Sequence, residues 1–328
     1  MRQRIIGNGG LWIAVLLACA LSALEFFVGH PQDLEGRLGI CLPSPNLWPI
    51  PDRISWITNL VLLIFLGLAL HFFNKTYNFI SSSDTIPSAA FIFLCGANPW
   101  ISGLLTSSLL LMGANLICLN LLFNCYRSPK GMEQMFVVGV ILALGSMMEY
   151  GFIFMIPAYL LISATLKCLH LRSFIAYLMG LVTPYWIGIG LGLIPLDVLS
   201  YPSITNLFED FATKQSLLVG LLNGAVTILI MVLLILSNAV KLYAGNTRRR
   251  LMNNSIVILG IIVSACMICD VDNVTAYFAT LYFVVATQLA NFFVLHNVRH
   301  INTLIFVFVA LYLVAYFFMI IGYLPALL

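Results

Sequence analysis

The sequence predicts an all-α protein, a polytopic bundle of about eleven transmembrane helices. Of its 328 residues, 62% are hydrophobic and only 8% are charged, whereas a soluble domain is about half apolar and about a quarter charged. Apolar runs of roughly the 20 residues that cross a bilayer recur along the whole chain. The alternating ten-residue segments of an outer-membrane barrel do not occur. Backbone polar groups in lipid must therefore be satisfied within helices.

Clusters of polar residues, Pro and Gly divide the apolar runs into helices of one transmembrane domain. The first run follows Arg2 and Arg4, as in a signal peptide, and we interpret it as the first span. The two largest connections are the loops 31–53 and 196–215, both expected on the outer side. The expected helices cover residues 10–30, 54–73, 87–99, 101–124, 133–148, 151–167, 173–195, 216–240, 254–269, 274–297 and 302–324.

The distribution of Lys and Arg predicts the orientation, because cytoplasmic loops are enriched in these residues. With the N-terminus inside and eleven crossings, every basic residue lies inside except Arg37, Arg53 and Lys214. We therefore expect a multi-pass protein of the bacterial inner (cytoplasmic) membrane, with a cytoplasmic N-terminus and a C-terminus outside.

Two segments leave the number of spans open. Residues 87–124 are expected to form a helical hairpin that turns at Asn98–Pro99, and residues 133–167 another that turns at Glu149–Gly151. If each segment were instead one broken helix, the protein would have nine spans. That alternative would bury Glu149 near mid-bilayer, where a carboxylate costs several kcal/mol, so eleven spans are preferred.

Three breaks or turns carry further expectations. The segment Asn98–Gly103 is expected at the outer surface, with Trp100 in the interfacial aromatic belt. Thr183–Pro184 is expected to break the seventh span, because proline lacks the N–H group that a helix needs. On the inner side, Thr247–Arg250 predicts a basic turn that anchors the orientation, with binding of anionic headgroups as the alternative.

Two further groups of residues have ordinary interpretations. Asp270 and Asp272 are interpreted as acids of an outer turn that the charge rule leaves behind. Cys266 and Cys269 form a C-x-x-C pair, but no His or second pair lies near them in sequence. We interpret both as small hydrophobic residues that pack within a span.

The first outer loop holds the strongest candidates for chemistry. Asp33 and Glu35 lie just beyond the first span, close enough to act as a general base or to hold Mg²⁺ or Mn²⁺. The alternative is a pair of ordinary solvated loop acids. Glu25 lies within the apolar run itself and, with the nearby His30, is a candidate substrate-binding residue. A membrane acid usually faces a cavity or a partner, although Glu25 could also snorkel to the interface.

A second candidate substrate-binding pair is Glu149 and Tyr150, at the outer break between two spans. The chain contains no Walker loop, no H-E-x-x-H, no G-x-S-x-G and no G-x-G-x-x-G sequence. No feature indicates nucleic-acid binding. Sequence motifs alone therefore name no reaction, and whether the protein is an enzyme stays open.

Residues 98–195 have a pattern that resembles a known family. Asn98–Pro99 precedes a long helix ending at Arg127, followed by the small-residue run Gly139–Ser146, an acidic break, Ile156–Pro157 and a further span. This pattern resembles the transmembrane module of the GT-C glycosyltransferases, which take a sugar from a polyprenyl-phosphate carrier at the outer face. The chain is also similar to uncharacterised bacterial inner-membrane proteins of its length. The resemblance implies a transferase in which the acidic pair of the first outer loop, Asp33 and Glu35, serves catalysis.

The resemblance has departures that keep alternatives open. The chain is short for the family, no separate outer domain follows its spans, and Glu149 stands where such enzymes often place a basic residue. The alternative is a non-catalytic membrane subunit or lipid-binding scaffold with a membrane protein partner. A third reading is a small-solute transporter, which would need a polar site at mid-membrane. In every reading the expected partners include membrane lipids, and for the transferase polyprenyl phosphate.

Overall fold

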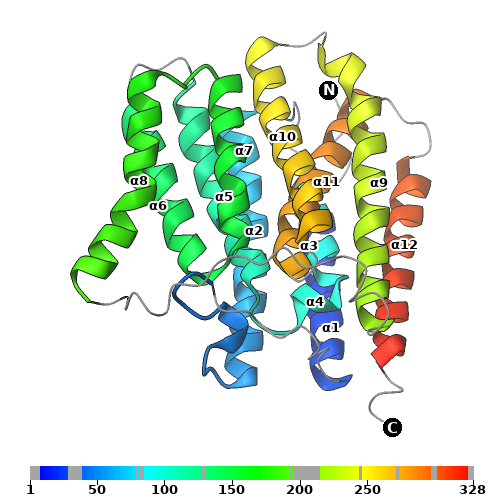
Figure 1. Ribbon diagram of the computed structural model, residues 1–328. Coiled ribbons are helices and arrows are strands. Elements are labelled where there is room, and N and C mark those ends of the chain that lie inside the picture. Colours follow the sequence, from blue (N-terminus) through cyan, green and yellow to red (C-terminus); the bar gives the residue numbers. More distant parts are fainter. Residues whose placement is uncertain are drawn as a thin grey trace.

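The computed structural model describes residues 8–28, 39–78, 80, 85–126, 131–192, 194, 215–243, 246–270, 273–296 and 301–323. Within these ranges the chain is an all-α bundle without strands (Figure 1). A short 3-10 turn, η1 (Pro45–Leu47), lies in the first long connection. The helices are α1 (Asn8–Val28), α2 (Asp52–Tyr77), α3 (Ile86–Gly96), α4 (Pro99–Ser102), α5 (Ser107–Asn124), α6 (Gly131–Met148), α7 (Gly151–Thr165), α8 (Leu171–Gly190), α9 (Gln215–Tyr243), α10 (Thr247–Cys269), α11 (Val274–Leu295) and α12 (Ile301–Tyr323).

Helix length and composition confirm a polytopic membrane protein. Nine of the described helices are long and apolar enough to cross a bilayer, and α3 and α7 are apolar but shorter. The chain reverses direction between α3 and α5 and between α6 and α7 (Figure 1), as the two expected hairpins require. The broken-helix alternative reaches nine spans by joining α3 with α5 and α6 with α7. The nine long helices are a different set, because α5 and α6 are each long enough to cross a bilayer without their short neighbours α3 and α7.

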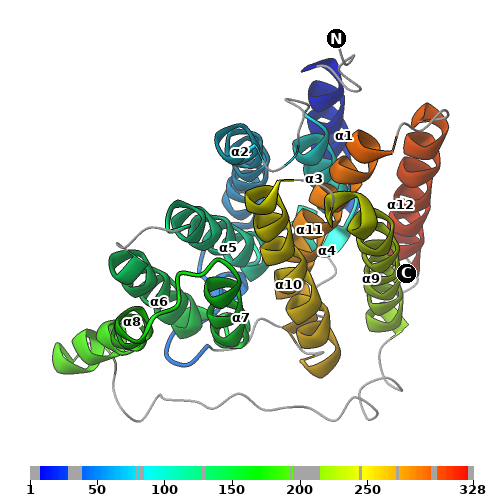
Figure 2. The ribbon, with the colours of Figure 1, turned by 90° about the horizontal axis from the view of Figure 1, so that it is seen from above.

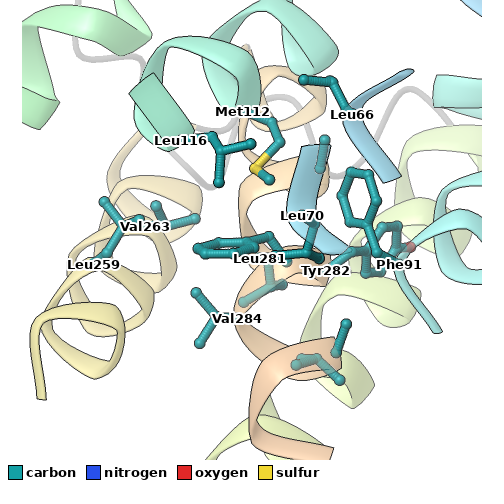
Figure 3. Packing of buried hydrophobic residues seen from close by; sticks show 14 of the residues in the cluster. Leu66, Leu70, Phe91, Met112, Leu116, Leu259, Val263, Leu281, Tyr282 and Val284 are labelled. Atoms are coloured by element: carbon teal, nitrogen blue, oxygen red, sulfur yellow. The ribbon is translucent and has the colours of Figure 1, made fainter. Parts of the chain in front are cut away.

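Helix α11 forms the centre of the bundle. Residues 276–291 of this helix are all buried, and it packs against α3, α5, α9 and α10 (Figure 2). Figure 3 shows Leu281 of α11 lying among Met112 and Leu116 of α5 and Val263 of α10. Lipid covers apolar side chains as well as protein does, so the burial of α11 is better explained by its polar side chains, which need protein partners in a membrane.

Polar side chains of α11 join it to the surrounding helices. The amide of Asn115 in α5 donates to Thr280 Oγ1 at 3.0 Å, and Gln288 donates to Asn253 of α10 at 3.0 Å. Asn238 of α9 donates to the carbonyl of Gln288 at 2.9 Å. Because lipid offers no hydrophobic driving force between helices, such bonds and close packing are what hold a membrane bundle together.

The α6–α8 pair packs by close approach of two backbones at one edge of the bundle (Figure 1). A Cβ atom on Gly139 of α6 would lie 2.5 Å from the carbonyl oxygen of Tyr177 in α8. Gly180 of α8 is equally tight against the backbone of Phe136. Glycine at the crossing point therefore allows an approach that any larger residue would prevent.

One helix continues where the sequence predicted a break, and another begins earlier than predicted. Helix α8 runs through Pro184 without a break, and Thr183 Oγ1 donates to the carbonyl of Met179 at 2.6 Å. The expected basic turn is instead the first turn of α10, which begins at Thr247 because Asn246 Oδ1 accepts from the N–H of Arg248 at 3.1 Å. Such a cap satisfies one of the N–H groups that a helix start leaves free.

The two ends of the bundle differ in charge. We call one end the acidic face, since it carries Glu25, Glu149 and Asp270 near the ends of α1, α6 and α10. The opposite end, the basic face, is formed by the end of α2 and by the connections α7–α8 and α9–α10 (Figure 1). Its described basic residues include Lys75, Lys167, Arg172, Lys241, Arg248, Arg249 and Arg250. The described residues that the charge rule assigned to one side therefore share one face, and its cytoplasmic placement stays a prediction.

Candidate functional site

The most unusual element of the bundle is the break between α3 and α5, residues 97–106, which includes the four-residue helix α4. Asn98 is fully buried, and its Oδ1 caps α4 by accepting from the N–H of Trp100 at 3.1 Å. Ile101 and Ser102 are buried as well. Irregular backbone in a membrane protein persists only where protein covers it or where it lines a cavity. The break is of the first kind.

The break lies inside the bundle, which corrects the expected position at the outer surface. Asn98 Nδ2 donates to Tyr282 Oη of α11 at 2.9 Å. The ring of Trp100 is only 5% exposed and meets Phe278 edge-on at 5.8 Å between ring centroids. Trp100 is therefore not part of an interfacial belt. The break lies inside the bundle because the helix that leads to it is short. Helix α3 has 11 residues and covers only about 16 Å at roughly 1.5 Å per residue.

Helices α1 and α2 also hold the break. Ser22 Oγ donates to the carbonyl of Ser102 at 2.7 Å, and Asn59 Nδ2 donates to the carbonyl of Ile101 at 2.6 Å. The N–H of Leu105 donates to Ser55 Oγ at 2.9 Å. Side chains thus replace the backbone partners that a continuous helix would supply.

Glu25 lies against this break and is only 2% exposed. Ser102 Oγ donates to Glu25 Oε2 at 3.1 Å. Its carboxylate also occupies the space that a Cβ on Gly103 would need. The prediction that Glu25 faces a partner inside the protein is confirmed, whereas the snorkelling alternative is wrong because the side chain points into the bundle. Its role in substrate binding stays a prediction.

The second candidate pair, Glu149 and Tyr150, forms the turn between α6 and α7, and both side chains are buried. The described end of the first outer loop covers this turn. The N–H groups of Cys41 and Leu42 donate to the carbonyl of Met147 at 3.2 and 2.8 Å. The loop thereby satisfies a carbonyl that the end of α6 leaves without a helical partner.

Asp270 lies at the α10–α11 turn and is far from an ordinary loop acid. It is 6% exposed, and Asn273 Nδ2 donates to its two carboxylate oxygens at 3.1 Å each. Tyr277 Oη donates to Asp270 Oδ2 at 2.8 Å. The same ring packs on Gly151, the residue at the start of α7. The interpretation of Asp270 as a solvated acid is therefore wrong, because its carboxylate organises a buried turn.

The remaining predicted site residues, His30, Asp33 and Glu35, lie outside the described residues. The described chain resumes at Gly39, close to the α6–α7 turn. In the described part of the chain, no group of three or more His, Cys, Asp or Glu side chains could hold a metal ion. The expectation of Mg²⁺ or Mn²⁺ at Asp33 and Glu35 stays a prediction.

Two apolar grooves lie between the described helices. One, of about 360 Å³, runs between α9 and α12 and is lined by Leu222, Leu311 and Phe318, with Asn223 and Tyr312 as its polar members. The three apolar residues are 60%, 45% and 66% exposed, respectively, so the groove opens toward lipid. The second, of about 280 Å³, lies between α1, α3, α11 and α12 and is almost wholly apolar.

Sequence reasoning missed the polar members of the first groove. Asn223 Nδ2 donates to Tyr282 Oη at 3.3 Å, and Tyr312 Oη lies 3.0 Å from Thr227 Oγ1. In the sequence these residues appear only as uncharged polar residues within apolar runs. Such residues are too common in membrane helices to indicate a site. Tyr282 receives donors from both Asn98 and Asn223, so it links the groove to the break.

Comparison with known proteins finds no matching family model, no matching curated protein and no matching solved structure.

Proposed function

We propose that the protein binds the hydrocarbon chain of a membrane lipid in the α9–α12 groove and uses that lipid as a substrate. The observation that carries the proposal is the groove itself, an apolar channel open to lipid with Asn223 and Tyr312 among its lining residues. Surrounding lipid competes equally well for apolar surface. Selectivity must then come from the shape of the groove, since Asn223 and Tyr312 are buried and bonded to Tyr282 and Thr227.

The substrate class follows from the resemblance to GT-C transferases, which implies a sugar carried on polyprenyl phosphate. In this proposal Asp33 removes the proton from the acceptor hydroxyl, and Glu35 supports it directly or through Mg²⁺ or Mn²⁺. The position of the groove supports this reading. Helix α9 begins at the acidic face, and Asn223 lies eight residues from that start, so the groove is in the half of the bundle nearer the acidic face. Helix α1 ends at the same face, and Asp33 follows its last residue by five positions in the sequence.

The binding step is tested by filling the groove. Ala315 lines it, and Ala315→Phe should displace the lipid chain. A matched control is Val240→Phe on α9, since Val240 is 79% exposed and lies outside the lining. Lipids that co-purify with each variant would be identified by mass spectrometry. We expect one lipid class to be enriched with the wild type and Val240→Phe and lost with Ala315→Phe. Equal lipid profiles for all three proteins would refute the groove as a binding site.

The catalytic step is tested separately with Asp33→Asn in a cell-based complementation assay. Loss of a general base typically lowers a rate on the order of a hundredfold or more, so this variant should fail to complement while retaining the co-purifying lipid. If Asp33→Asn complements and Ala315→Phe does not, the protein is a lipid-binding scaffold, and the transferase proposal is rejected.

A further inference from the structure

The end of α9 at the acidic face packs directly on the break, through a glycine and an indole ring. A Cβ atom on Gly220 of α9 would overlap the six-membered ring of Trp100. Both residues are buried, and the indole also meets Phe278 of α11. Because glycine has no side chain, Trp100 lies closer to the backbone of α9 than any other residue at position 220 would allow.

A second contact joins the break to α9 one turn further along. Tyr282 Oη accepts from Asn98 Nδ2 of the break at 2.9 Å and from Asn223 Nδ2 of α9 at 3.3 Å. Gly220 and Asn223 are three residues apart, so they lie on the same face of α9. Leu222 and Asn223 both line the α9–α12 groove. The break therefore holds the stretch of α9 that forms one wall of this groove.

The opposite wall of the groove, α12, is anchored by other contacts. Helix α4 packs against α12, and Tyr316 Oη donates to a carbonyl of α1 at 2.6 Å. Between the two walls, Thr227 Oγ1 and Tyr312 Oη lie 3.0 Å apart. Thr227 follows Gly220 by seven residues, about 10 Å along the helix at roughly 1.5 Å per residue. A displacement at Gly220 would therefore tilt the end of α9 about the Thr227 bond and change the distance between the walls at Leu222.

We propose that the contact of Trp100 with Gly220 sets the width of the α9–α12 groove and thereby determines which lipid chains the groove admits. Trp100 is a positioning residue, because it acts through α9 and is not among the described residues that line the groove. A groove that is too wide leaves voids beside a bound chain, and one that is too narrow excludes it. This inference rests on the proposed binding of a lipid chain, but the spacing of the two walls is measurable without any lipid.

Cross-linking tests the spacing of the walls. In a protein without its native cysteines, Leu222→Cys on α9 and Val314→Cys on α12 place one thiol on each wall, at positions that are 60% and 55% exposed. Bis-maleimides of graded length would be applied to the purified protein in detergent. Gly220→Ala should shift the most efficient cross-linker to a longer one, and adding Trp100→Phe, whose smaller ring leaves room for the new carbon, should restore the original length. An unchanged optimum in Gly220→Ala, or a shift that Trp100→Phe does not reverse, would overturn the proposal. Trp100→Phe alone should shift the optimum to a shorter cross-linker, which keeps the test decisive if Gly220→Ala fails to fold.

Lipid analysis by mass spectrometry tests the selectivity. The matched control is Gly190→Ala in α8, where the added carbon meets no atom within 4 Å. We expect the chain composition of the enriched lipid to change severalfold in Gly220→Ala, to return in the double variant with Trp100→Phe, and to stay unchanged in Gly190→Ala. Enriched lipid of unchanged chain composition in Gly220→Ala would reject the positioning role alone. Absence of any enriched lipid with the wild type would instead reject the proposed function, and the inferred selectivity with it.

Discussion

The buried turn at Asp270 allows a prediction whose magnitude follows from its contacts. Among the described contacts of Asp270 are three hydrogen bonds that it accepts, two from Asn273 at 3.1 Å and one from Tyr277 at 2.8 Å. Tyr277→Phe removes the shortest of them and leaves the other two. A hydrogen bond to a charged group contributes about 1.5–3 kcal/mol, while side-chain bonds measured between membrane helices average about 0.6 kcal/mol. We expect a loss of about 1–2 kcal/mol in the free energy of unfolding.

Asp270→Asn should cost a similar amount for a different reason. The amide of the substituted Asn can accept from Tyr277 through its oxygen. Its NH₂ group then faces the NH₂ group of Asn273, so two donors meet and one acceptor of Asn273 is lost. The two substitutions act on one contact, so the double variant should cost less than the sum of the single ones. The assay is reversible unfolding in mixed micelles by titration with sodium dodecyl sulfate, followed by circular dichroism. Additivity of the two losses within about 0.5 kcal/mol, the behaviour of independent sites, would refute the reasoning.

Three further predictions concern packing, chemistry and orientation. Gly180→Ala should destabilise the bundle by about 1–3 kcal/mol through overpacking, whereas Gly190→Ala, on the same helix with no atom within 4 Å of the added carbon, should leave thermal stability nearly unchanged. Burial raises the pKa of the Cys41 thiol above its ordinary value. In a variant that keeps only this cysteine, the rate of maleimide labelling should therefore rise about tenfold per pH unit through pH 8, because only the thiolate reacts. A plateau below pH 8 would contradict it. Reporter fusions after Arg127 and Arg250 should both show cytoplasmic activity, and outer-side activity after Arg250 would overturn the predicted topology.

The candidate site could be anticipated only in part. Glu25 and Glu149 stood out because an acid inside an apolar run is rare and costly, and both proved to be buried. Asp270 was misjudged, since its sequence context is that of an exposed turn and its partner Tyr277 lies seven residues further on, inside α11. Ser22 and Asn59, which hold the break, gave no local signal. Uncharged polar residues are tolerated in membrane helices for many reasons, so their type alone does not indicate a site.

The sequence by itself determined the solvent of this protein, the approximate limits of its helices and the grouping of its basic residues. These properties follow from composition and from runs of neighbouring residues, which hydropathy and charge report directly. Only the tertiary structure decided that the break at 97–106 lies inside the bundle and that α11 is its centre. The deciding contacts join residues far apart in the chain: Ser22 with Ser102, Asn98 with Tyr282 and Leu21 with Tyr316. The local sequence pattern cannot identify such contact partners. Which residues meet depends on which helices pack together, and the packing depends on shape complementarity over the whole bundle.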